Sequence, residues 1–380
     1  MENKVILGVG VIVVIVLALV VIFSQSTPTG AFALGTNNPL AIGAVLSLTG
    51  KAASYGHDIQ NGMELAFYDI NKSGKPLNVK LLYDDTTSVP EKAVTSVQKF
   101  IGFDGAKVII GVGADEVLAM VPITEESKVI LATPIAGSDK VDGAGKYVFR
   151  NRESSKFTAY SLAELLNAKG YNRVALFVAS SSASPISYQK SFLEKFQSFG
   201  GSAESFSYAE SSPDVRTSIA KVKELDINAV YVIAGKDSDG AEVIRQLKEM
   251  GFDGLIVGGP ALETTKFFES TKGSAEGVVI AVAPVDSSAP NATQVLEEYK
   301  STYGKEMSFS AANAYDLVML LNSASGKCDS NTDCIREYLL SVKDYPGLGG
   351  KTSFNPNGGV SKVMSYKIAN EGKFVPYKAS

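Results

Sequence analysis

Short apolar runs alternate along this chain with longer segments in which apolar residues recur every three or four positions. The clearest example lies between residues 41 and 71, where the run Ile42 to Leu46 has the continuous apolarity of a strand buried on both faces. A loop of small and hydroxyl residues follows from Ser47 to Gly56 and carries one large aromatic residue, Tyr55. Helical spacing then begins, with apolar residues at Ile59, Met63, Ala66, Phe67 and Ile70. The pattern predicts a strand, a ligand-sized loop and an amphipathic helix.

The same unit repeats through residue 138. Further strands are predicted at 79–83, 108–111 and 129–133, and helices at 89–101 and from the turn 112–116 to about residue 127. Strand and helix alternate without hairpin signals, so the sheet is expected to be parallel. In such sheets ligands collect at the carboxyl ends of the strands.

The pattern then restarts and predicts a second set of βα units. Helices are expected at 160–169, 188–199, 240–250 and 299–323, and strands at 173–178, 229–233, 255–257 and 278–282. A chain of 380 residues is long enough for two cores. We therefore expect two lobes rather than one large sheet.

The N-terminus carries an uncharged apolar segment, Val5 to Phe23, followed by a polar stretch up to Asn38. Its 19 residues favour a membrane anchor over a signal peptide, whose apolar region is shorter. Ala31-Phe32-Ala33 nevertheless resembles a small-residue cleavage site, so both alternatives stand. Either one places the rest of the chain outside the cytoplasmic membrane, anchored by residues 5–23 or secreted.

Composition narrows the chemistry. A net charge of −4 gives no general basic surface, so nucleic acid is not an expected partner. One histidine and two cysteines leave little material for a metal cluster or a catalytic triad, and no cofactor is predicted. In an exported domain the default interpretation of Cys328 and Cys334, which bracket a polar turn, is a disulfide.

Residues 41–71 also resemble the opening of the type I periplasmic binding proteins of the leucine/isoleucine/valine-binding group, the receptors of ABC importers. The resemblance rests on the matched positions Leu48, Thr49, Gly50, Ala53, Gly56, Asn61, Gly62, Leu65, Ala66, Ile70 and Asn71, and it extends to about Lys373. It implies an α/β fold with two Rossmann-like lobes, parallel central sheets and a three-strand hinge, after the N-terminal segment. The expected parts are residues 1–38, a first lobe of 39–149 plus 283–346, and a second lobe of 150–282 plus 347–380. The chain would cross between lobes near 147–151, 281–285 and 345–352.

The resemblance further implies that the ligand lies between the lobes, at strand ends and helix N-termini. Carried over position by position, it suggests a set of ligand-binding candidates: Tyr55, Gly113, Ala114, Asp115, Ala136, Ser138, Ser184, Asp237, Ala261 and Phe309. Residues 180–185 replace the aromatic wall common at this position in the family, so that wall is expected to be missing.

Two of these positions depart from the amino-acid-binding pattern. Asp115 stands where a serine would hold the α-carboxylate, and Ala261 stands where an acid would hold the α-ammonium. A carboxylate at Asp115 repels a ligand carboxylate and favours a cation or a hydrogen-bond donor, unless it only caps the helix. Amides, urea-like compounds, peptides and cationic solutes are therefore alternatives to a branched-chain amino acid.

The expected function is the extracytoplasmic solute-binding subunit of an ABC importer, which captures a small amino-acid-like or amide ligand by hinge closure and works with a membrane permease. A ligand-sensing receptor domain is one alternative. An enzyme is another, but the paired acids Asp84-Asp85 and Asp115-Glu116 are more simply turn and helix-start residues, so no catalytic residue is assigned.

Overall fold

A computed structural model describes residues 39–50, 52–180, 183–211 and 213–378. The predicted anchor or signal segment lies outside the described residues. None of the helices in the described part of the chain combines the length and apolarity that a membrane-spanning helix requires.

The first lobe is built on a parallel sheet with the strand order β2-β1-β3-β4-β5. Its strands are short and almost wholly buried where they lie at the centre, which is why they read as continuous apolar runs. The strands are β1 (Leu40–Leu46), β2 (Val79–Asp85), β3 (Val108–Gly111), β4 (Ile130–Thr133) and β5 (Val148–Arg150).

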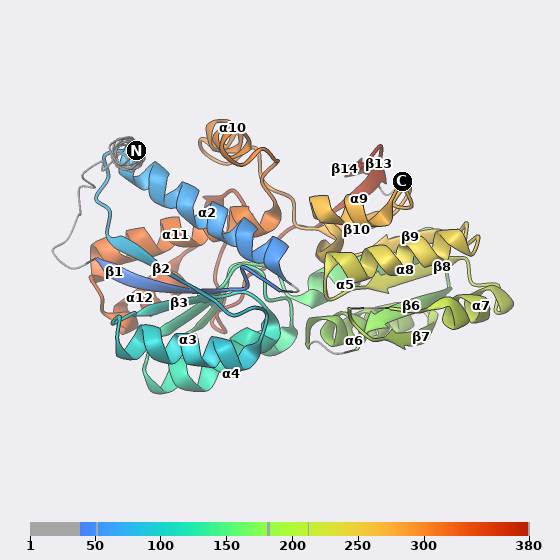
Figure 1. Ribbon diagram of the computed structural model, residues 1–380, viewed down its shortest axis with the longest axis horizontal. Coiled ribbons are helices and arrows are strands. Elements are labelled where there is room, and N and C mark those ends of the chain that lie inside the picture. The colour runs from blue at the N-terminus through green and yellow to red at the C-terminus, as the bar shows by residue number, and fades with distance from the viewer. Residues whose placement is uncertain (1–38, 51, 181–182, 212, 379–380) are drawn as a thin grey trace, which may run out of the picture. The chain divides into compact units, whose positions relative to one another are not determined.

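Helices cover both faces of this sheet (Figure 1). One face packs against α3 (Pro90–Gly102) and α4 (Ala114–Glu126). The other packs against α2 (Ala53–Lys72) and three helices that return late in the chain, α10 (Ala292–Tyr303), α11 (Phe309–Cys328) and α12 (Thr332–Ser341). The predicted helix at 299–323 is thus two helices, and a disulfide joins Cys328 to Cys334 at the end of α11.

The glycines of the opening motif allow close backbone approach. A Cβ at Gly62 would lie 2.1 Å from the carbonyl oxygen of Ala311, so α2 and α11 meet backbone to backbone at this point. A Cβ at Gly56 would lie 2.0 Å from the carbonyl oxygen of Ser47. These contacts hold α2 against the residue after β1 at Gly56 and against α11 at Gly62, which positions Tyr55 on the first turn of α2.

The second lobe has a seven-stranded sheet with the order β14-β13-β10-β9-β8-β6-β7. Five of its strands are parallel, and β13 and β14 form an antiparallel hairpin at one edge that the sequence pattern did not predict. The strands are β6 (Arg173–Ala179), β7 (Ser202–Tyr208), β8 (Ala229–Ile233), β9 (Leu255–Gly258), β10 (Val279–Val282), β13 (Ser365–Asn370) and β14 (Lys373–Tyr377). The fold class is therefore confirmed: two α/β lobes with parallel central sheets.

Two layers of helices complete this lobe. One apolar cluster joins the sheet to α5 (Ser155–Ala168) and α6 (Ala183–Ser198). The opposite cluster joins it to α7 (Arg216–Glu224), α8 (Asp237–Glu249) and α9 (Thr265–Thr271). Short 3-10 turns lie at Asp139–Val141 and Pro260–Leu262.

Three segments connect the lobes. The first runs from β5 to α5 and the second from β10 to α10. The third was predicted at 345–352, but in the structure that segment forms a small antiparallel sheet of β11 (Tyr345–Gly347) and β12 (Gly350–Thr352). Leu348, Phe354 and Val360 are buried in the first-lobe core, so the chain reaches the second sheet only between Val360 and Ser365. The predicted boundary at 346/347 is too early because these apolar side chains still complete the first lobe.

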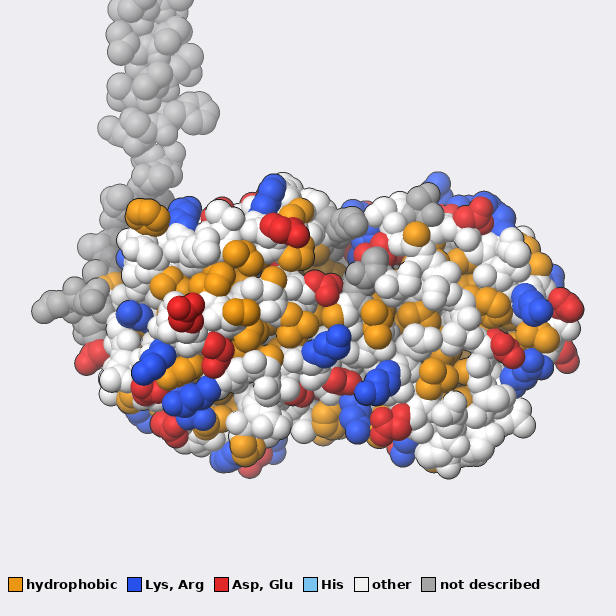
Figure 2. All heavy atoms as spheres, turned by 90° about the horizontal axis from the view of Figure 1, so that it is seen from below, with side chains coloured by type: hydrophobic (Ala, Val, Ile, Leu, Met, Phe, Trp, Pro, Cys, Tyr) orange, Lys and Arg blue, Asp and Glu red, His pale blue; other side chains and the backbone are white. Residues whose placement is uncertain are grey.

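Figure 2 shows acidic and basic side chains interspersed over the visible face of both lobes. This face therefore carries no large patch of charge of a single sign.

Candidate functional site

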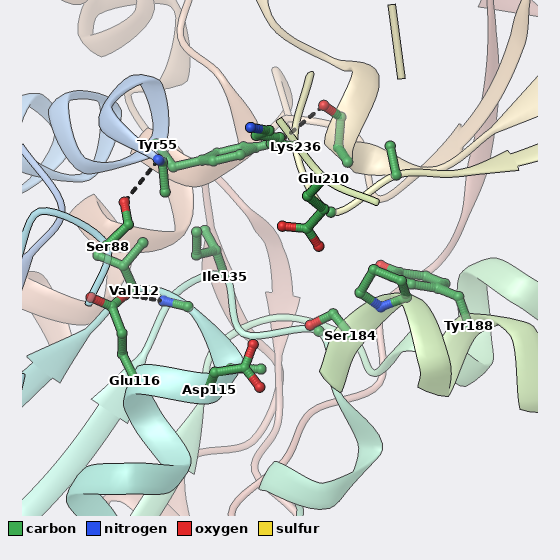
Figure 3. A pocket seen from close by; sticks show the side chains of 18 of the residues that line it. Tyr55, Ser88, Val112, Asp115, Glu116, Ile135, Ser184, Tyr188, Glu210 and Lys236 are labelled. Atoms are coloured by element: carbon green, nitrogen blue, oxygen red, sulfur yellow. Dashed lines mark hydrogen bonds between the residues drawn. The ribbon is translucent and has the colours of Figure 1, made fainter. Parts of the chain in front are cut away.

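A pocket of about 390 Å³ lies where the two lobes face one another (Figure 3). The first lobe contributes Ala52, Tyr55, Ser88, Pro90, Val112, Gly113, Ala114, Asp115, Glu116, Ile135, Gly137 and Phe309. The second lobe and the first connection contribute Arg152, Ser184, Pro185, Tyr188, Glu210, Ala234, Gly235, Lys236 and Ala261. A volume of this size holds a small solute.

Four helices begin at or beside this pocket. The first residues of α2, α4, α6 and α8 each follow the carboxyl end of a parallel strand, which is where a βα unit places them. A helix N-terminus carries unpaired backbone N–H groups and a partial positive charge, so it attracts an anion. What occupies these ends decides which ligand charge the pocket accepts.

At α4, the protein supplies the anion itself. The carboxylate of Glu116 accepts a hydrogen bond from the backbone N–H of Gly113 at 3.3 Å and further bonds from the hydroxyls of Ser47 and Thr86. Burial raises the pKa of Glu116, while the Thr86 hydroxyl, the Gly113 N–H and the Ser47 hydroxyl oppose the rise. Glu116 rather than Asp115 therefore caps this helix.

Asp115 instead reaches the other lobe. Its carboxylate accepts a hydrogen bond from the backbone N–H of Ala183, the first residue of α6, at 3.2 Å. Burial raises the pKa of Asp115; the Ala183 N–H opposes this and the negative charge of Glu210 adds to it. The side chains of Asp115 and Glu210 point into the pocket from opposite sides (Figure 3).

Two further contacts close one rim between the lobes. The hydroxyl of Tyr55 donates to the carbonyl oxygen of Ala261 at 2.9 Å. The carboxylate of Asp237 accepts from the hydroxyl of Ser54 at 3.3 Å and from that of Thr264 at 2.7 Å. Asp237 is buried at the first position of α8 and so matches the positive end of that helix.

Arg152 anchors the first connection beneath the pocket. Its guanidinium donates to the carbonyl oxygen of Ile135, to the Glu153 carboxylate and to the Tyr188 hydroxyl, and it lies over the ring of Phe309. Burial lowers the pKa of Arg152, but Tyr188 and Glu153 together raise it by more, so the net shift is upward. The arginine is therefore a cation that the protein has already paired.

Lys236 is the second basic residue of the lining. Its ammonium group lies 3.3 Å from the carboxylate of Asp239. That carboxylate also accepts from the backbone N–H of Ser211 at 3.1 Å. Both basic side chains of the described lining thus have acidic partners close by.

The structure brings together seven of the ten predicted binding residues. Tyr55, Gly113, Ala114, Asp115, Ser184, Ala261 and Phe309 line the pocket. Tyr55 lies on the first turn of α2 rather than in the predicted loop, because the helix begins six residues before the first apolar residue of its pattern.

Three predicted residues do not line the pocket. Ala136 is buried in the turn after β4, where its N–H bonds the Thr133 hydroxyl. Ser138 is fully buried and its hydroxyl is 3.0 Å from that of Ser187. Asp237 forms the rim contact described above.

The sequence reasoning missed Arg152, Tyr188 and Glu210. The predicted loss of an aromatic wall after β6 is wrong, because Tyr188 supplies an aromatic side chain from the second turn of α6. Glu210 follows β7, an edge strand that was not predicted. The polar run at the first connection, residues 150–153, was the one available signal for Arg152.

Within the described ranges, no group of three or more histidine, cysteine, aspartate or glutamate side chains is placed to hold a metal ion.

The fold and the pocket define a class: a two-lobed solute-binding protein with its site between the lobes. The chain belongs to the periplasmic binding protein family, whose sequence pattern matches residues 39–369, and it is of the type I, leucine/isoleucine/valine-binding kind. This is a family of solute-binding proteins and not an enzyme family.

Relatives and solved structures agree with this assignment. The Leu/Ile/Val-binding protein BraC3 of Rhizobium johnstonii is 24% identical, over 91% of this chain and 95% of its own length. The leucine-binding protein LivK of Thermotoga maritima is 25% identical with a TM-score of 0.84, covering 89% of this chain and 98% of that one. A solute-binding protein of an ABC transporter from Rhodopseudomonas palustris, solved with benzoate, shares the fold at 18% identity and a TM-score of 0.79, covering 89% of this chain and 95% of that one.

Proposed function

We propose that this chain is the extracytoplasmic solute-binding subunit of an ABC importer, and that it captures a small amino-acid-like or amide solute by closure of its lobes and delivers it to a membrane permease. The observation that carries the proposal is the pocket itself, which takes its walls from both lobes. A ligand in such a pocket touches both walls only when the lobes are together, so it binds the closed arrangement better than an open one.

The connections between the lobes support this motion. Three segments of the chain join them, and the rim contacts Tyr55 to Ala261 and Ser54 to Asp237 are single hydrogen bonds. Each such bond contributes about 0.5–1.5 kcal/mol, which is small enough for the lobes to separate and close again.

The test is a binding screen with the full-length chain in detergent. Circular dichroism follows the unfolding of the chain in the presence of amino acids, amides, polyamines or short peptides. A ligand should raise the free energy of unfolding, because a solute at 100 times its Kd adds ~2.7 kcal/mol to stability. Cells lacking the chain should lose uptake of the same solute. Binding without any effect on uptake would contradict the importer role.

A blocking variant locates the site. Ser184→Trp places a large ring on the pocket wall and should abolish the ligand-induced shift. Ser198→Trp, at the exposed far end of the same helix, is the matched control and should leave the shift unchanged. An undiminished shift in Ser184→Trp would show that the solute binds elsewhere.

A further inference from the structure

Helix α6 turns one of its sides toward the first lobe. Residues four apart lie on the same side of a helix, and Ala183, Ser187 and Ser191 are spaced in this way. Ala183 packs against an apolar cluster of the first lobe, whereas Phe192 and Phe196 of the same helix belong to the second-lobe core. Ser187 and Ser191 are only 7% and 3% exposed. This side of α6 is therefore an interface between the lobes.

Two of these positions bond the first lobe close to the pocket. The backbone N–H of Ala183 donates to the carboxylate of Asp115 at 3.2 Å. The hydroxyls of Ser187 and Ser138 lie 3.0 Å apart. A buried hydroxyl needs a hydrogen-bond partner, and Ser187 has its partner on the other lobe. Separation of the lobes at α6 would break both contacts.

Asp139, in the short 3-10 turn after β4, bonds two helices of the second lobe. Its carboxylate accepts from the hydroxyl of Ser191 on α6 at 3.1 Å and from that of Ser155, the first residue of α5, at 2.9 Å. Hydrogen bonds to a carboxylate are stronger than those between neutral groups. Ser155 directly follows the first connection, whereas Ser191 lies two turns beyond Ala183 along α6. The bond to Ser191 thus joins the lobes away from the connection itself.

These contacts do not depend on a solute. Of the residues that make them, only Asp115 lines the pocket. The hydroxyls of Ser138, Ser187 and Ser191 and the carboxylate of Asp139 bond one another outside it. They therefore favour closure whether or not a solute is bound.

We propose that these groups form a clasp that raises the closed-to-open ratio of the chain before the solute arrives. The clasp consists of Asp115, Ser138 and Asp139 of the first lobe and of Ala183, Ser187 and Ser191 of α6. This inference rests on the proposed capture of a solute by closure and adds a control of that step. A receptor binds with an apparent Kd equal to its intrinsic Kd divided by the fraction in the binding-competent form, so the clasp tightens binding largely through groups that do not touch the solute.

The distance between the lobes reports the clasp without any solute. Spin labels at Glu91→Cys in the first lobe and Lys266→Cys in the second are both exposed and lie outside the pocket and the clasp. Cys328 and Cys334 are held in a disulfide, so the labels attach to the introduced thiols. Double electron–electron resonance on the full-length chain in detergent should show a short distance from the closed arrangement, alone or beside a longer one.

Loss of the clasp should move the chain toward the longer distance. The double variant Ser187→Ala with Ser191→Ala removes two contacts between the lobes and should lower the ratio of short to long distances by roughly tenfold. Ser198→Ala is the matched control, because the Ser198 hydroxyl bonds Lys195 within the same helix, and it should leave the ratio unchanged. Urea unfolding of each variant verifies that it is folded.

A double-mutant cycle separates a direct contact from a general effect on α6. Asp139→Ala should lower the ratio of short to long distances, because it removes the acceptor of the Ser191 hydroxyl. Adding Ser191→Ala to Asp139→Ala should then change the ratio no further. A full additional effect would show that Ser191 acts elsewhere and would overturn the pair.

The remaining outcomes separate the clasp from the broader function. A wild-type chain that shows only the long distance would overturn the clasp, as would an unchanged ratio in the double serine variant. Neither result would touch the solute-binding function, because a receptor can close on its ligand without a clasp. Failure of that function would instead appear in the binding screen, which does not depend on the distance measurement.

Discussion

The free energy of unfolding should depend on pH through Asp316, a buried carboxyl group on α11. Its two oxygens accept from the backbone N–H groups of Leu348 and Gly349, each at 2.8 Å. Beside it the buried ammonium group of Lys362, in the third connection, donates to Asn313 and to the carbonyl oxygen of Gly349 at 2.6 Å. The network ties α11 to the turn between β11 and β12 and to the connection itself.

The sign follows from the shift in pKa. Burial raises the pKa of Asp316 from its ordinary value of 3.8 to about 6, although the charge of Lys362 and the two backbone N–H groups oppose the rise. Between these two values the folded chain binds more protons at this site than the unfolded chain, so stability falls as pH increases. A shift of about two units corresponds to a loss of ~3 kcal/mol across the window. Burial lowers the pKa of Lys362 to about 8, so the lysine stays protonated throughout.

The assay compares urea unfolding of the wild-type chain and of Asp316→Asn between pH 4 and pH 7.5. Titrating groups far from residue 316 cancel in the difference between the two proteins. Lys362 does not cancel, because the charge of Asp316 raises its pKa, so the comparison rests on the pH range below the pKa of the lysine. We expect the wild type to lose ~3 kcal/mol relative to the variant as pH rises through the window. Asp253→Asn, at an exposed residue of the second lobe, is the control and should track the wild type. A difference between wild type and Asp316→Asn that does not change with pH would refute the reasoning.

Two further predictions concern the pocket and the helices that form it. Tyr55→Phe removes the hydroxyl that bonds Ala261 across the rim. Loss of a hydrogen bond worth about 0.5–1.5 kcal/mol should raise the Kd of the captured solute by roughly 2- to 12-fold. Tyr171→Phe is the control, because the Tyr171 hydroxyl makes no such contact, and it should leave the Kd unchanged. Gly62→Ala should lower the free energy of unfolding by about 1–3 kcal/mol in urea titrations, because its Cβ would lie 2.1 Å from a backbone oxygen of α11, and an unchanged midpoint would contradict that packing.

The elements that could be predicted from the sequence are those whose pattern comes directly from burial. Strands β1, β3, β4 and β8 are short runs buried along their whole length, so their apolar residues stand out. Strand β7 escaped because it is an edge strand with mostly exposed polar residues, and α7 escaped because charged residues dominate its short length. The prediction merged α10 and α11 into one helix at 299–323, although Gly304, the left-handed C-cap of α10, separates them.

The site was predictable only where a residue's role depends on its place in a βα unit. Gly113, Ala114 and Asp115 line the pocket because they start a helix after a central strand. Glu210 and Tyr188 reach it through the fold of a different lobe, and no local pattern reports which helix of one lobe faces which strand end of the other. The role of Asp115 shows the same limit, since its partner Ala183 is 68 residues away in the chain.

The position of Asp115 links the charge of the pocket to lobe closure. Its carboxylate belongs to the first lobe, yet it accepts a hydrogen bond from Ala183 of the second lobe, and the negative charge of Glu210 raises its pKa. Bringing the lobes together therefore has two opposing effects at this residue: a hydrogen bond forms and two like charges approach. The free energy of closure therefore depends on the charge of Asp115 as well as on the contacts of the captured solute.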